Sequence, residues 1–303
     1  MPTPVAFQRA LLGFPHPGRK PFHGLTPSGE GAGRRLTLSP LRDVISRHGL
    51  DARRKLGQHF LLDANLTARI AREAGDLAGR HVVEVGPGPG GLTRALLETA
   101  AAGVVAVEVD ARAILAIEEL AVAYPGRLRV LDADATRLDL ATLVPAPRVI
   151  AANLPYNIAT PLLIGWLRQA AQWERMTLMF QLEVAERITA APGTGAYGRL
   201  SVLAGWTCRA ALLLRLPPAA FTPPPKVWSA VVGLQPHPEQ PPADLFTAME
   251  RLTAAAFGQR RKMLRGALRP LGGEALLERA GIAGERRAET LSVAEFDRLV
   301  RLL

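Results

Sequence analysis

The stretch Glu84-Val85-Gly86-Pro87-Gly88-Pro89-Gly90-Gly91 lies between an apolar run at 81–85 and a helical pattern that begins at Leu92. Glycine lets the backbone turn sharply and approach a ligand closely. Three of these glycines have the G-x-G-x-x-G spacing of nucleotide-binding turns that join a strand to a helix. The stretch therefore predicts a nucleotide site at the end of a first strand, and a tight turn without a ligand is the alternative.

Short apolar strands alternate with helical patterns after this stretch. We expect strands at 104–109, 128–132, 149–153 and 176–181, with helices at 92–101, 111–124 and 160–170. A helix at 200–207 and strands at 210–216 and 227–234 follow. Such alternation with short links is typical of α/β proteins, so we predict a parallel sheet with helices on both faces. Ligands of these sheets bind beyond the carboxyl ends of the strands.

The two ends of the chain differ from this middle part. Residues 1–35 are rich in Pro, Gly and Arg, which predicts a disordered N-terminal extension. A transit peptide or a start codon assigned too early are alternatives for this segment. Helices are expected at 40–49 and 63–75. After a Pro-rich linker at 237–242, only helical patterns remain, at 243–256, 258–271, 275–280 and 293–302. We therefore predict an extension (1–35), an α/β domain (36–235) and a helical C-terminal domain (236–303).

The composition narrows the classes of function. Lys and Arg number 37 against 27 Asp and Glu, a formal net charge of +10, which favours a polyanionic partner such as nucleic acid or an anionic membrane. No apolar run reaches the roughly 18 residues of a membrane-spanning helix, so no membrane partner is expected. The single cysteine, Cys208, excludes an internal disulfide and favours the cytoplasm. The histidines lack zinc-finger spacing, so no metal is expected.

Acidic residues at the strand ends indicate the kind of ligand. Glu108 ends the second strand, where it can accept hydrogen bonds from a ribose diol. Glu84, just before the glycines, disfavours a diphosphate and suits a cationic ligand. Asp134 follows the third strand and can accept from an adenine amino group, with a helix cap as the alternative. Adenosine joined to an amino acid through a sulfonium describes S-adenosylmethionine, whose product is S-adenosylhomocysteine.

The segment Asn153-Leu154-Pro155-Tyr156 stands at the end of the strand expected at 149–153. The Asn153 side-chain oxygen and a backbone carbonyl oxygen held by the proline can together accept both protons of an exocyclic amine. Accepting these protons localises the nitrogen lone pair toward a methyl donor, so positioning can replace a general base. Tyr156 offers a flat face on which a base stacks. A turn with a packed tyrosine is the alternative.

A second aromatic residue is expected at the same pocket. The segment Phe221-Thr222-Pro223-Pro224-Pro225-Lys226-Val227 joins the last two expected strands, and its prolines stiffen it. We expect Phe221 to cover the other face of the base. A phenylalanine of the hydrophobic core is the alternative.

Six motifs in a fixed order carry a resemblance to a known family. They are Arg54-Lys55-Leu56-Gly57-Gln58-His59-Phe60-Leu61, the glycine stretch, Asn153-Leu154-Pro155-Tyr156, Ala196-Tyr197-Gly198-Arg199-Leu200-Ser201, Phe221–Val227 and Phe257-Gly258-Gln259-Arg260-Arg261-Lys262. Over residues 40–303 the chain resembles the small-subunit (16S) ribosomal RNA adenine N6,N6-dimethyltransferase family, the kasugamycin-sensitivity methyltransferases. The resemblance implies methylation of N6 of two adjacent adenosines in the 3′-terminal hairpin of 16S RNA, during small-subunit biogenesis. It also implies a Rossmann-like methyltransferase domain followed by a small all-α domain.

The resemblance also assigns roles to residues. It places S-adenosylmethionine contacts on His59, Leu61, Gly86, Glu108, Asp134 and Asn153. The glycine stretch itself adds Glu84 and Gly88 as expected cofactor residues. The target amine is held by Asn153, Tyr156 and the backbone oxygen of Leu154, with Pro155 and Phe221 beside them. His59 stands where relatives carry Asn or His, so this contact can differ in kind. The N-terminal extension departs from the family pattern.

Two basic clusters are the expected contacts with RNA. The first is Arg53-Arg54-Lys55, and the second is Arg260-Arg261-Lys262 with Arg265 and Arg269. In the helix expected at 258–271, i, i+4 spacing places three of these arginines on one face. Phosphate binding by such clusters predicts salt-sensitive affinity. A solvated helix face is the alternative.

Other functions remain as alternatives at this point. A large-subunit adenine methyltransferase of the macrolide-resistance type is the nearest, but the basic helical tail and the phenylalanine–proline loop favour the small subunit. A non-catalytic assembly or transcription factor of the same fold leaves an intact Asn153–Tyr156 motif unexplained. A nicotinamide dehydrogenase explains the glycines and Glu108 only. We expect a monomer that acts on 16S RNA within the small ribosomal subunit.

Overall fold

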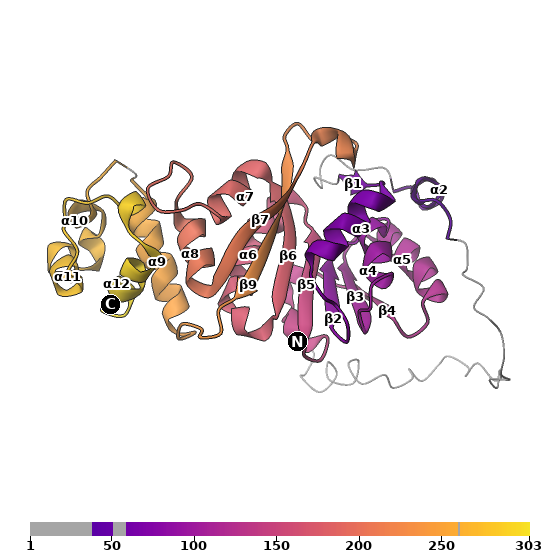
Figure 1. Cartoon of the computed structure of the whole chain (residues 1–303), viewed down its shortest axis with the longest axis horizontal. Coiled ribbons are helices and arrows are strands. Elements are labelled where there is room, and N and C mark those ends of the chain that lie inside the picture. Colours follow the sequence, from indigo (N-terminus) through magenta and orange to yellow (C-terminus); the bar gives the residue numbers. More distant parts are fainter. Residues whose placement is uncertain (1–37, 51–58, 260) are drawn as a thin grey trace. The chain divides into compact units, whose positions relative to one another are not determined.

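A computed structural model describes residues 38–50, 59–259 and 261–303 (Figure 1). Its main sheet has the strand order β4-β3-β2-β5-β6-β9-β7. The strands are β2 (His81–Val85), β3 (Gly103–Glu108), β4 (Leu128–Asp132), β5 (Arg148–Asn153), β6 (Arg175–Gln181), β7 (Cys208–Leu216) and β9 (Ser229–Pro236). Successive residues of β2, β3, β5 and β6 are buried, although their side chains alternate between faces. The expected cover on both faces of the sheet is therefore present.

The sheet is parallel only from β4 to β6, so the prediction of an all-parallel sheet is wrong at one edge. β9 pairs antiparallel with both β6 and β7. The connection from β7 to β9 contains no α-helix, only a short 3₁₀ turn and β8 (Phe221–Thr222). Parallel neighbours need a crossover, usually helical, whereas antiparallel neighbours do not. A second, two-stranded sheet pairs β8 with β1 (Phe60–Leu61), and the sequence pattern did not predict it.

Helices precede and follow the strands, and aspartate side chains cap two of those that the structure describes. The helices are α2 (Leu41–Arg47), α3 (Ala64–Glu73), α4 (Gly91–Leu97), α5 (Ala111–Ala123), α6 (Tyr156–Arg168), α7 (Leu182–Ile188) and α8 (Arg199–Thr207). Asp63 caps α3 by accepting from the Asn65 and Leu66 amides, as predicted. α6 begins at Tyr156, earlier than the expected residue 160, because Pro155 occupies the N-cap. The short α7 was not predicted.

The C-terminal segment is helical, as expected, but one expected helix is wrong. The structure has α9 (Leu245–Phe257), α10 (Leu264–Ala267), α11 (Gly273–Ala280) and α12 (Val293–Val300). The described residues of 258–271 do not form the one helix predicted: α9 ends at Phe257, α10 begins only at Leu264, and a 3₁₀ turn with Pro270 follows it. Glycine stops helices readily, and proline cannot continue one. Arg261, Arg265 and Arg269 therefore do not share one helix face.

One buried cluster runs from the central strands into the C-terminal helices, for example from Leu203 and Trp206 of α8 to Phe246 of α9 and Phe296 of α12. Trp206 also donates from its indole nitrogen to Asp297 at 2.8 Å. The division at residues 235 and 236 stays a prediction, and the extension 1–35 lies outside the described residues. Within the described ranges, no helix is long and apolar enough to cross a membrane.

Candidate active site

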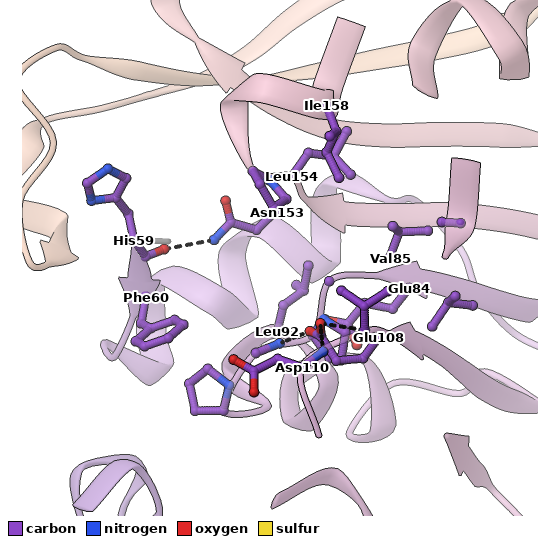
Figure 2. A pocket seen from close by; sticks show the side chains of 18 of the residues that line it. His59, Phe60, Glu84, Val85, Leu92, Glu108, Asp110, Asn153, Leu154 and Ile158 are labelled. Carbon is purple, nitrogen blue, oxygen red and sulfur yellow. Dashed lines mark hydrogen bonds between the residues drawn. The ribbon is translucent and has the colours of Figure 1, made fainter. Parts of the chain in front are cut away.

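A pocket of about 360 Å³ opens at the carboxyl ends of β2, β3 and β5 (Figure 2). Its lining includes the predicted cofactor residues His59, Leu61, Glu84, Gly86, Gly88, Glu108, Asp134 and Asn153. Leu154, Pro155 and Tyr156 also line it. The structure therefore brings to one cavity every predicted cofactor residue and four of the five residues predicted to hold the target base.

The glycine stretch is built for close approach by β1. Gly86, Gly88 and Gly90 all have positive φ, a region that other residues rarely adopt. A Cβ atom on Gly91 would lie 2.5 Å from the Leu61 carbonyl oxygen, and one on Gly88 would lie 3.1 Å from the Phe60 ring. The turn and β1 therefore form one tight wall of the pocket.

Glu108 links the end of β3 to the glycine turn. Its Oε1 accepts from the amides of Val109 at 2.8 Å and Asp110 at 3.0 Å, and its Oε2 accepts from the Gly88 amide at 3.4 Å (Figure 2). These bonds fix the position of the carboxylate, and they satisfy a residue that is only 8% exposed. An ionised carboxylate has about four acceptor sites, so sites remain for a ribose diol.

Glu84 is the most perturbed group of the pocket. Burial raises the pKa of its carboxyl to about 8; the charge of Glu108 adds to the shift and the Thr93 hydroxyl opposes it. Its Oε2 is buried and has no hydrogen-bond partner among the described residues. A buried, unpaired carboxyl is costly, and a nearby cation would relieve the cost by favouring the charged form. The pocket thus fits a ligand with a positive charge.

Asp134 has the capping role that the sequence left open. Its Oδ1 accepts from the Thr136 amide at 2.9 Å and the Thr136 hydroxyl at 2.6 Å. These bonds, and a 3.4 Å ion pair with Arg137, lower the pKa of Asp134. The residue is partly exposed and lines the pocket, and its contact with an adenine amino group stays a prediction.

Asn153 is oriented by a residue far away in the sequence. Its side-chain nitrogen donates to the His59 carbonyl oxygen at 3.3 Å (Figure 2). Because the amide nitrogen is used in this way, the side-chain oxygen is the end that faces the pocket as an acceptor. This is the polarity that accepting an amine proton requires.

Tyr156 is held by Ser229, the first residue of β9. The two hydroxyl oxygens lie 2.6 Å apart, and Ser229 is fully buried. Burial raises the pKa of the Tyr156 hydroxyl, so the ring stays neutral. Sequence reasoning missed Ser229, although a single polar residue at the start of the apolar strand Ser229–Leu234 was a usable signal.

The His59 ring lies between Tyr156 and the Phe221–Val227 segment and contacts both. The ring centroid lies 5.7 Å from that of Tyr156 and 6.5 Å from that of Phe221, and its Nδ1 lies 2.8 Å from the Pro223 carbonyl oxygen. Phe221 itself is 3% exposed and does not line the pocket. Its place against the target base stays a prediction.

The predicted RNA-binding residues are only partly described. Arg53, Arg54, Lys55 and Arg260 lie outside the described residues. Arg261 and Lys262 are exposed in the turn before α10, and Arg265 of α10 pairs with Glu285 at 3.2 Å. Lys262 and Arg269 line a surface hollow at this turn. The second cluster is thus gathered by a turn rather than by a helix face.

No group of three or more His, Cys, Asp or Glu side chains could hold a metal ion within the described ranges. The strand order, the glycine turn and the acidic strand ends define a Rossmann-like enzyme with a nucleotide-type pocket. The family model for ribosomal RNA adenine dimethylase matches residues 49–303, and the chain belongs to this family.

Individual relatives agree with this assignment. The ribosomal RNA small subunit methyltransferase A of Gluconobacter oxydans (strain 621H) is 66% identical over 267 residues, which cover 88% of each chain. The crystal structure of a dimethyladenosine transferase from Plasmodium falciparum has a TM-score of 0.68 at 25% identity, covering 80% of this chain and 96% of that one. The 23S rRNA methyltransferase ErmE has a TM-score of 0.61 at 27% identity, covering 80% and 99%.

These similarities confirm the predicted family, the Rossmann-like methyltransferase fold and the enzyme class, an rRNA adenine dimethyltransferase. The large-subunit alternative is not favoured, because similarity to the small-subunit relative is far higher than to ErmE. The non-catalytic alternative is also not favoured, because the relative and the family model are both named for methyl transfer.

Proposed function

We propose that this protein transfers methyl groups from S-adenosylmethionine to N6 of two adjacent adenosines in the 3′-terminal hairpin of 16S RNA, within the small ribosomal subunit. The observation that carries the proposal is the orientation of Asn153, whose side-chain oxygen is left as an acceptor at the pocket by the bond to the His59 carbonyl oxygen. This oxygen can accept a hydrogen bond from one N–H of an amine, and the Leu154 carbonyl oxygen is the proposed acceptor for the second.

The pocket residues fit S-adenosylmethionine. Glu84, buried and without a partner for Oε2, suits the positive charge of the ligand. Glu108 offers fixed acceptors for the ribose hydroxyls, and Asp134 offers one for the adenine amino group. The glycine turn lets the backbone approach the amino-acid portion. When bound, the ligand supplies an electrophilic methyl group on a sulfonium, which is already a good leaving group.

The chain contributes position and polarisation to the reaction. Asn153 Oδ1 and the Leu154 carbonyl oxygen accept hydrogen bonds from the two N6–H groups. These hydrogen bonds turn the nitrogen lone pair toward the methyl carbon. Tyr156, anchored by Ser229, stacks on the base and fixes its plane. As the new N–C bond forms and the C–S bond breaks, one N6 proton leaves to solvent. No side chain needs to act as a strong base.

RNA binding is proposed for the basic turn before α10 and for Arg53, Arg54 and Lys55. Arg261 and Lys262 are exposed there, and the chain carries a net charge of +10. Phosphate contacts of this kind give affinity and orientation, while choice of sequence comes from RNA shape and from the base that enters the pocket. We propose a cytoplasmic enzyme that works as a monomer.

The test is transfer of labelled methyl from S-adenosylmethionine to undermethylated small ribosomal subunits, with large subunits in parallel, followed by nucleoside analysis. We expect N6,N6-dimethyladenosine in small-subunit RNA alone. Label confined to large-subunit RNA would refute the proposed substrate. Absence of label in both, with subunit binding retained, would refute the proposed catalysis.

A further inference from the structure

Trp228 is an exposed aromatic residue that the reaction described above does not use. It is 48% exposed, and its neighbours Lys226 and Val227 are also exposed. The other three tryptophans of the chain, Trp166, Trp173 and Trp206, are at most 6% exposed. A large aromatic side chain left in water needs a reason, because its burial would stabilise the fold.

The backbone of Trp228 is fixed directly before β9, next to the residue that anchors Tyr156 of the pocket. Its carbonyl oxygen accepts from the Leu182 amide at 2.8 Å. The next residue, Ser229, pairs with β6 and β7 and holds the Tyr156 hydroxyl at 2.6 Å. Consecutive Cα atoms are about 3.8 Å apart, so Trp228 lies one residue from the anchor of the proposed stacking residue. The indole is therefore exposed without being on a loose loop.

The surroundings of Trp228 suit a nucleic acid. Lys226 stands two residues away. Arg215, near the end of β7 and beside the start of β9, is 58% exposed on its side chain and pairs with Glu186 at 3.5 Å. Exposed aromatic side chains next to cationic ones bind single-stranded RNA by stacking bases while the cations contact phosphates. Among the residues that the structure describes, the exposed large hydrophobic side chains here are Val227 and Trp228, which is small for a protein-docking patch.

We propose that Trp228 is a stacking platform for an RNA base that neighbours the target adenosine, with Lys226 contacting the adjoining phosphate. The inference rests on the proposed function, because the target adenosine defines where the neighbouring base lies. The platform holds the unpaired strand beside the pocket and so selects a flexible, splayed hairpin over a paired helix. It acts on RNA binding, and it does not touch the reacting nitrogen.

Fluorescence offers a direct test on the unaltered protein. Acrylamide, a neutral quencher, reaches Trp228 far more readily than the three buried tryptophans. We expect an RNA fragment carrying the 3′-terminal hairpin of 16S RNA to reduce the quenchable fraction of the emission. In Trp228→Phe, that fraction should be small both with and without RNA. Unchanged quenching at saturating RNA would overturn the inference.

Affinity for the same fragment is the second test. Trp228→Ala should weaken binding roughly 5- to 150-fold, the range for loss of one stacked base. Trp228→Phe should stay within about threefold, since a ring remains. Val122→Ala is the matched control, because Val122 is also an exposed apolar residue, at 77%, but lies on α5. Equal affinity of Trp228→Ala and the control variant would overturn the inference.

The remaining outcomes separate this inference from the proposed function. Methyl transfer to small subunits together with unaltered RNA affinity in Trp228→Ala overturns the platform alone. A loss of affinity for intact subunits but not for the protein-free fragment assigns Trp228 to a protein contact, and this also overturns it. A wild-type protein that neither binds the fragment nor methylates small subunits overturns both.

Discussion

Glu84→Gln tests whether the pocket carries a buried acid that is neutral until a cation arrives. The folded protein holds the pKa of this carboxyl at about 8, against 4.5 for the ordinary group, because the residue is 1% exposed. The shift makes folding favour the protonated form. The contribution of the neutral carboxyl to the free energy of unfolding is complete below pH 4.5 and is lost as the pH rises through 8.

The size of the effect follows from the two pKa values. One unit corresponds to about 1.4 kcal/mol. Relative to low pH, the free energy of unfolding therefore falls by about 2 kcal/mol at pH 6 and about 4 kcal/mol at pH 8, because the unfolded chain releases the proton that the folded protein retains. Glutamine resembles the neutral acid in shape and does not ionise. The stability of Glu84→Gln relative to wild type should therefore rise by about 2 kcal/mol between pH 6 and pH 8.

The assay is urea unfolding of the ligand-free protein at pH 6, 7 and 8, followed by circular dichroism. Glu98→Gln is a matched control, since it removes the same chemical group from an exposed position directly after α4. A constant difference between wild type and Glu84→Gln across this pH range would refute the assignment of a buried neutral acid. S-adenosylmethionine should bind wild type more tightly at pH 8 than at pH 6, and this dependence should flatten in the variant.

Three further changes probe the pocket and its supports. Asn153→Ala should nearly abolish methyl transfer while small-subunit binding, measured by co-sedimentation, is retained; equal loss of both would make the residue structural. Ser229→Ala removes one buried hydrogen bond to the motif tyrosine, worth about 1 kcal/mol. The thermal midpoint should therefore fall by about 2 °C, and kcat should fall roughly fivefold because Tyr156 is less firmly held. Gly91→Ala places a Cβ atom 2.5 Å from the Leu61 carbonyl oxygen and should destabilise the fold by about 1–3 kcal/mol. Gly165→Ala is the control, because its Cβ atom meets nothing within 4 Å and should not destabilise the fold. Similar thermal midpoints for both variants would contradict the close packing of the glycine turn against β1.

The parts of the fold that depend on residues adjacent in the sequence were predictable from the sequence. The glycine stretch and the alternation of strands and helices place β2, β3, β4, β5 and β6 within a residue or so of their observed ends. Asp63 capped its helix as expected. The antiparallel pairing of β9 was not predictable in this way, because nothing in the apolar run 229–234 states which neighbour it joins or in which direction. The continuous helix expected at 258–271 was wrong because most of these residues have good helix propensity, and tertiary packing overrides propensity.

The same distinction holds at the site, where the chemistry was predictable and its orientation was not. Residue type identified Asn153 as an acceptor for an amine, but the end of its amide that faces the pocket depends on the His59 carbonyl oxygen, 94 positions away. Tyr156 depends in the same manner on Ser229, 73 positions away. Both partners come from segments outside β5, so the segment Asn153–Tyr156 is oriented only when β1 and β9 have been assembled around it. A motif of this kind therefore indicates a reaction, and the bonds made to it by distant segments decide whether the reaction geometry is present.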